Sequence, residues 1–212
     1  MIAIPDPDVV FTDLGLAALG GYLGWRLRRE RRRGVIVMVG LASAALWGAV
    51  FHAFFPAKTA TEAGFLVWLL VAFSIAVVAE SLLDMALTML FARFGPSARP
   101  VIRRAIVVGY CVLFAVVILF VDESFTSVAR LYVPTVLLML FVAQYQASRS
   151  GDATWMLISG GLALSLLAAL LQQAHVAIDP VYFDHNALYH VVQAAALVVL
   201  YFGFRAVRLG AG

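Results

Sequence analysis

Long apolar runs separated by short polar stretches fill almost the whole chain of 212 residues. Each of seven runs approaches or exceeds the roughly 20 residues that a helix needs to cross a bilayer. They cover residues 9–27, 34–55, 63–91, 101–121, 125–147, 154–174 and 186–207. The runs are continuous, without the ten-residue alternation of an outer-membrane barrel. The pattern therefore predicts an all-α fold, an integral membrane bundle of seven transmembrane helices.

The composition agrees with a membrane protein. Hydrophobic residues make up 64% of the chain, charged residues only 13%, and the mean hydropathy is +0.98. These values lie far outside the range of soluble globular proteins. The connections are short and contain no proline-rich or glycine-rich linker, so we expect one domain over residues 1–212.

The charges alternate between the two ends of the predicted helices. Thirteen of the fifteen cations lie in or beside the first, third and fifth connections or after the last run. The positive-inside rule places these segments in the cytoplasm and the N-terminus outside. Because the basic charge reflects topology, we expect no nucleic-acid partner. We expect a multi-pass protein of the inner (cytoplasmic) membrane of a bacterium.

All four histidines fall at the predicted outer end of the helices: His52, His175, His185 and His190. His52 lies about 27 Å along its helix from Gly34, at 1.5 Å per residue. Polar side chains at membrane depth cost free energy, so they usually mark a site inside the protein. Imidazoles from three helices that meet in one cavity would form a metal site, and zinc suits them best.

Further polar residues lie near the same predicted depth. Glu62 and Asp184 are candidate catalytic residues, because a carboxylate can act as a fourth zinc ligand or as a general base. Asn186 and Gln193 share a helix face with His190, and Gln172 shares one with His175. These three amides are candidate substrate-binding residues. Their other interpretation is hydrogen bonding between helices.

Zinc lowers the pKa of bound water and makes hydroxide available near neutral pH. The sequence thus favours a zinc-dependent hydrolase that cleaves an amide or ester bond at the outer membrane face. A site walled by apolar helices predicts a membrane lipid as substrate. The pattern also leaves room for a homo-oligomer.

Three short motifs resemble a known superfamily. His52 lies late in the second run, the acidic Glu62 follows ten residues later, and the seventh run opens with the sequence from His185 to His190. This arrangement resembles the seven-helix zinc hydrolases of the alkaline ceramidase and progestin and adipoQ receptor superfamily. The resemblance implies zinc ligands at His52 and His190 and an acidic residue at Glu62. The chain departs from that pattern where Gly48 replaces a serine and Asn186 replaces a histidine, so His185 or His175 would have to supply the missing ligand.

Two other classes of function compete with the hydrolase. One is a metal-free lipid-binding or scaffold protein, in which the histidines only form hydrogen bonds. The other is a haem-binding redox protein, since paired histidines on facing helices can provide axial ligands. A covalent retinal pigment is excluded, because the sole lysine, Lys58, lies in a predicted loop and no span offers an amine for a Schiff base.

The first run carries small residues at helical spacing. Asp13, Ala17, Gly20, Gly21 and Gly24 lie on one predicted face, which would let a second helix approach closely.

Glu80 and Asp84 lie one turn apart toward the cytoplasmic half of the third run. We expect them to pair with arginines such as Arg26 or Arg28, or to form a proton relay.

Overall fold

The all-helical architecture predicted from the sequence is confirmed by a computed structural model, which describes residues 6–29, 32–55, 58–92 and 99–207. When the turn at Val117–Val121 is counted with the helix before it, no predicted boundary differs from an observed one by more than three residues. The long helices are α1 (Pro7–Leu27), α2 (Arg32–Phe54), α3 (Glu62–Phe91), α4 (Arg99–Val116), α5 (Phe125–Ser150), α6 (Ala153–Gln173) and α7 (His185–Ala206). Two short elements are the 3₁₀ turn η1 (Lys58–Ala60) and the π-helical turn η2 (Val117–Val121), which extends α4.

Six of the seven long helices in the described part of the chain are long and apolar enough to cross a membrane, by length and composition. They indicate a multi-pass membrane protein. The helix outside this set is α1, which carries Asp8, Asp13 and Arg26 among its 21 residues.

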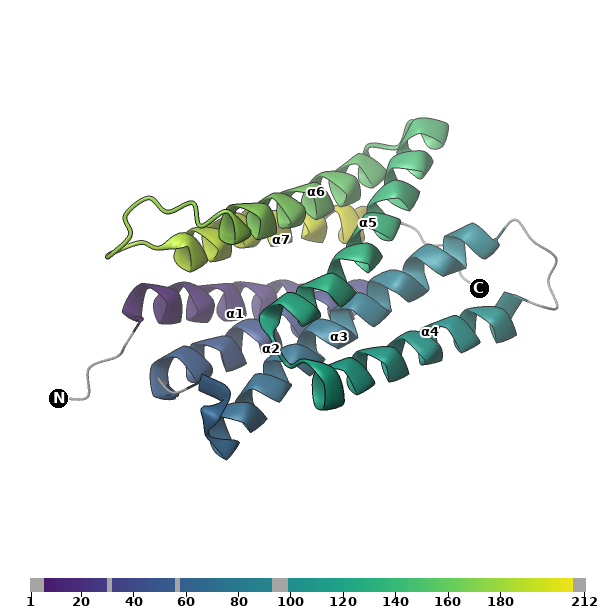
Figure 1. The fold of residues 1–212 in the computed structure, drawn as a ribbon. Coiled ribbons are helices and arrows are strands. Elements are labelled where there is room, and N and C mark those ends of the chain that lie inside the picture. The colour runs from purple at the N-terminus through teal and green to yellow at the C-terminus, as the bar shows by residue number, and fades with distance from the viewer. Residues whose placement is uncertain (1–5, 30–31, 56–57, 93–98, 208–212) are drawn as a thin grey trace.

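Six helices pack in a closed ring. In order around it, α1 contacts α2, then α3, α5, α6 and α7 follow, and α7 contacts α1 again. Helix α4 lies outside the ring against α3 (Figure 1). We call the end where α1, α3, α5 and α7 begin the histidine end, and the opposite end, where α2, α4 and α6 begin, the arginine end.

Two glycines of α1 allow the close approach to α2 that the sequence predicts. A Cβ atom on Gly20 would lie 3.1 Å from the Ala42 Cβ, and one on Gly24 would lie 2.9 Å from a methyl carbon of Val39. The prediction is wrong for Gly21, where a Cβ would meet no atom within 4 Å. One residue corresponds to about 100° of helical rotation, so Gly21 points away from the contact face.

At the arginine end, Asp84 joins three helices. Its carboxylate lies 2.9 Å from Arg33 of α2 and 3.1 Å from Arg103 of α4. Both arginines also donate to the Thr88 hydroxyl, at 3.3 and 2.9 Å. The predicted pairing of Asp84 with arginine is therefore present, although with different partners.

The arginines named in that prediction bind elsewhere. The guanidinium of Arg26 lies 5.9 Å from the centre of the Tyr22 ring, and that of Arg28 lies 4.3 Å from the centre of the Trp25 ring. Both therefore contact aromatic rings of α1, and Arg26 also donates to the Tyr22 hydroxyl at 3.0 Å.

Candidate functional site at the histidine end

A cavity of about 500 Å³ opens inside the ring toward the histidine end. All six ring helices contribute to its wall. Its apolar lining includes Leu16, Leu41, Phe51, Trp68 and Val71. Its polar lining within the helices consists mainly of Asp13, His52, Gln172, Asn186, His190 and Gln193. The cavity is thus amphipathic, with apolar walls and a set of converging polar groups.

The centre of this polar set is a buried pair between the first and last helices. His190 Nε2 lies 3.1 Å from Asp13 Oδ1. The two residues are only 7% and 4% exposed, so neither side chain can be hydrated as in water. Buried polar groups of this kind are stable only when they are paired, because each loses its contact with water.

Thr12 completes the hydrogen bonding of the His190 ring. Its Oγ1 lies 3.0 Å from Nδ1, and it donates its single proton to the Asp8 carbonyl at 2.8 Å. The hydroxyl therefore accepts from Nδ1–H, which leaves one further proton between Nε2 and the Asp13 carboxyl group. That proton is the one His190 could exchange with a group in the cavity.

In nucleophilic catalysis a hydroxyl contacts a base, and an acid on the other side of the base orients it. Thr12, His190 and Asp13 contact one another in this order. However, Thr12 is absent from the cavity lining, whereas His190 and Asp13 belong to it. A bound molecule would therefore meet the acid–base pair and not the hydroxyl. Thr12 therefore holds the imidazole ring of His190 in position.

Asp13 also explains the glycine at position 48. A Cβ atom on Gly48 would lie 2.8 Å from Asp13 Oδ2, closer than such contacts normally come. A side chain at this position would collide with the carboxylate that pairs with His190, so the Asp13–His190 arrangement favours a glycine here.

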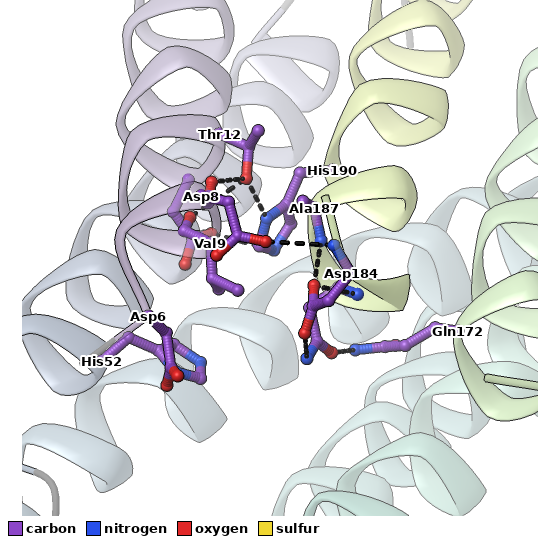
Figure 2. A network of polar contacts seen from close by, with 11 residues as sticks. Asp6, Asp8, Val9, Thr12, His52, Gln172, Asp184, Ala187 and His190 are labelled. Carbon is purple, nitrogen blue, oxygen red and sulfur yellow. Dashed lines mark hydrogen bonds and ion pairs between the residues drawn. The ribbon is translucent and has the colours of Figure 1, made fainter. Parts of the chain in front are cut away.

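The N-terminus of α7 is fixed to α1 by a second contact. Asp184 caps α7 by accepting from the backbone N–H groups of Asn186 and Ala187 at 2.8 and 2.9 Å. Its own N–H donates to Asp8 of α1 at 3.0 Å, and Figure 2 shows this link beside Thr12 and His190. Carboxylates stabilise helix N-termini in this way. Asp184 therefore acts as a helix cap outside the cavity lining.

The three predicted substrate-binding amides lie along the cavity. Gln172 donates to Asn186 Oδ1 at 2.9 Å, and Gln193 donates to Ser165 at 3.1 Å. Hydrogen bonding between helices was the other interpretation of these amides, and both contacts are of that kind. The Gln172 Oε1 atom is buried and has no hydrogen-bond partner among the described residues.

The four histidines do not gather at one point. His52 lines the cavity, and its Nδ1 lies 3.4 Å from Asp6 Oδ2. His175 and His185 stack edge to face, with ring centres 4.5 Å apart, and neither lines the cavity. The described residues contain no group of three or more His, Cys, Asp or Glu side chains able to hold a metal ion. As arranged here, the predicted ligands do not fit a zinc ion.

Glu62 also lies away from the cavity. It is exposed at the first turn of α3, after the N-cap Thr61. An acidic residue in the first turn interacts favourably with the helix dipole, which accounts for its position. The predicted catalytic acid is therefore not brought to the histidines.

The loop before α5 supplies carboxylates to the cavity rim that the sequence analysis did not single out. Asp122 and Glu123 line the cavity, and the Trp68 indole N–H donates to the Glu123 carbonyl at 2.6 Å. Hydrogen bonds from the Ser127 and Ser124 hydroxyls hold the pKa of Asp122 below its ordinary value. The rim therefore carries negative charge at neutral pH.

Asp13 is the main site residue that sequence reasoning missed. It was placed on the small-residue face of the first run and given no role in a site. Its depth was a usable signal, because Asp13 and His190 lie about one and a half turns from the starts of helices that begin at the same end.

The chain matches, over residues 9–209, the model of a family described only as a family of unknown function (DUF6962). No curated protein and no solved structure matches the chain.

Proposed function

This chain belongs to DUF6962, a family of unknown function, and we propose that it binds a membrane amphiphile in the cavity inside its helix ring. The observation that carries the proposal is the composition of that cavity. Leu41, Phe51 and Trp68 offer an apolar wall, and the Asp13–His190 pair lies in the same wall. Sites for small molecules commonly combine an apolar lining with a few placed polar groups.

The size and charge of the cavity narrow the ligand. About 500 Å³ lies within the usual range for a small-molecule site. This volume suits one acyl chain and its head group. The carboxylates of Asp122 and Glu123 at the rim repel an anionic head group, so a neutral or cationic one is favoured.

Quenching of Trp68 fluorescence by a brominated single-chain amphiphile tests this proposal. In a variant with Trp25, Trp47 and Trp155 changed to phenylalanine, we expect saturable quenching, because Trp68 lines the cavity.

A matched pair of variants controls for contact with bulk lipid. Ala44→Phe narrows the cavity and should abolish the saturable component, whereas Ala105→Phe adds the same ring on the exposed surface of α4 and should not. Quenching that rises linearly and is equal in both variants would refute binding in the cavity.

Zinc-dependent hydrolysis of a lipid is a second proposal. One observation favours it, since His52 and His190 line the same cavity. It requires a third ligand to move toward them. About one zinc per chain, lost in His190→Ala, would support it. A chain purified without chelator that contains no zinc would contradict it.

We further propose that α1 also crosses the membrane, with the histidine end outside and the arginine end in the cytoplasm of a bacterium. Asp179→Cys, in a chain whose sole cysteine Cys111 is changed to serine, should react with a membrane-impermeant maleimide on intact cells. Ser150→Cys, exposed at the arginine end, should react only after lysis. The reverse result would invert the topology.

A further inference from the structure

Two carboxylates one turn apart on α3 have opposite surroundings. Asp84 accepts from two arginines at 2.9 and 3.1 Å. Glu80 takes part in no ion pair with another described residue, although it is only partly exposed. Because Asp84 already engages Arg33 and Arg103, Glu80 is left without a cation of its own.

Glu80 lies at membrane depth. Helix α3 has 30 residues, which corresponds to about 45 Å, and Glu80 is about 5 Å past its midpoint toward the arginine end. The hydrocarbon core is about 30 Å thick, so a helix centred in it places Glu80 within the apolar layer. An unpaired charge there is strongly disfavoured, and such a group usually becomes neutral instead.

Tyr110 of α4, the helix that packs against α3, has an unused hydrogen-bonding group. The Tyr110 hydroxyl is buried and has no partner among the described residues. Tyr110 lies at the midpoint of the segment formed by α4 and η2, and it is within electrostatic range of the Glu80 carboxylate. A phenol can donate to a carboxylate and accept from a carboxylic acid, so it can serve both forms of Glu80.

We propose that Glu80 and Tyr110 form a proton-binding site in the middle of the membrane, between α3 and α4. At neutral pH Glu80 is a carboxylic acid. On release, its proton passes to water entering from the arginine end, and the Tyr110 O–H then donates to the carboxylate. Helix α4 has few packing partners besides α3, so it can adjust to this change. The site is separate from the cavity and does not depend on the proposed ligand.

Charged and titratable groups from each neighbouring helix act on this site. In addition to Tyr110, they are Arg33 of α2, Asp84 of α3 itself, Arg103 and Cys111 of α4, and Tyr132 of α5, which is near Tyr110. The arginines and Asp84 form their own cluster nearer the arginine end.

A hydrophobic carbodiimide tests the proposal on the full chain in detergent, because this reagent modifies protonated carboxyl groups in apolar surroundings. We expect mass spectrometry to locate the adduct on Glu80 at neutral pH. Labelling should fall about tenfold per pH unit once the carboxylate predominates. It should be lost in Glu80→Gln and kept in Glu62→Gln, which alters an exposed carboxyl group of the same helix.

Infrared spectroscopy gives a second measurement that does not depend on access of the reagent. The carbonyl band of protonated Glu80, taken as the difference between the native chain and Glu80→Gln so that any band of the buried Asp13 cancels, should disappear at high pH. Tyr110→Phe should keep the acid form of Glu80 to higher pH, because the carboxylate loses its donor.

Three results would overturn the proposal. The first is a Glu80 that is neither labelled nor visible as an acid in the infrared. The second is a Tyr110→Phe variant in which labelling and the infrared band keep their pH profiles, because Tyr110 would then have no part in the site. The third is protection from the carbodiimide by sodium chloride at constant pH, which would make Glu80 a sodium ligand instead.

Discussion

Replacing Asp13 with alanine is expected to lower the free energy of unfolding by about 3–5 kcal/mol, because it leaves His190 buried without its partner. The variant removes the carboxyl group that lies 3.1 Å from Nε2. Titration with sodium dodecyl sulfate, followed by circular dichroism, measures the loss in detergent.

A double-mutant cycle separates the pair from the rest of the site. Asp13→Ala with His190→Ala removes both partners, so the combined loss should be smaller than the sum of the single losses by about 1 kcal/mol or more. Glu62→Ala is the matched control, since this carboxylate is exposed, and it should change stability by less than about 0.5 kcal/mol. Losses that simply add would contradict a coupled pair.

Gly48→Ala is expected to destabilise the protein by about 1–3 kcal/mol, although alanine is the better helix former. The added methyl group would lie 2.8 Å from Asp13 Oδ2, and Asp13 cannot move away without weakening its contact with His190. Gly48→Ser adds the same Cβ atom and should also destabilise. The same detergent titration measures both variants.

Two comparisons isolate the steric cause. Gly21→Ala also adds a methyl group to a ring helix, but nothing lies within 4 Å of it, so stability should stay equal or rise by up to about 1 kcal/mol. In an Asp13→Ala background the collision is absent, and Gly48→Ala should then cost little. Equal losses with and without Asp13 would show that the carboxylate is not the obstacle.

The helices could be predicted from the sequence because hydropathy and length depend on each segment alone. The arginine distribution likewise located the two ends of the bundle. Helix α1, which carries Asp8, Asp13 and Arg26, was predicted as a span like the others and is the long helix outside the set that can cross a membrane by length and composition in the described part of the chain. Its place in the ring follows from contacts with α2 and α7, which no single segment encodes.

The sequence predicted how deep His52 and His190 lie along their helices, but not which helices lie side by side. Helical rise placed His52 and His190 near one level, and both line the cavity. The same reasoning could not tell which helices are neighbours, so it grouped His175 and His185 with them, although these two pair with each other. The order of helices around the ring decides such contacts, and it depends on the packing of the whole chain.

The contact between Thr12 and His190 joins residues 178 positions apart, and the Asp8–Asp184 link spans 176. During synthesis the first helix is therefore made long before its partner exists. Until α7 is made, Asp13 is an acidic group with no imidazole to bind, and α1 is poorly suited to lipid. Closure of the ring thus depends on the last helix, so a chain truncated before α7 would lack both links and be a natural target for quality control.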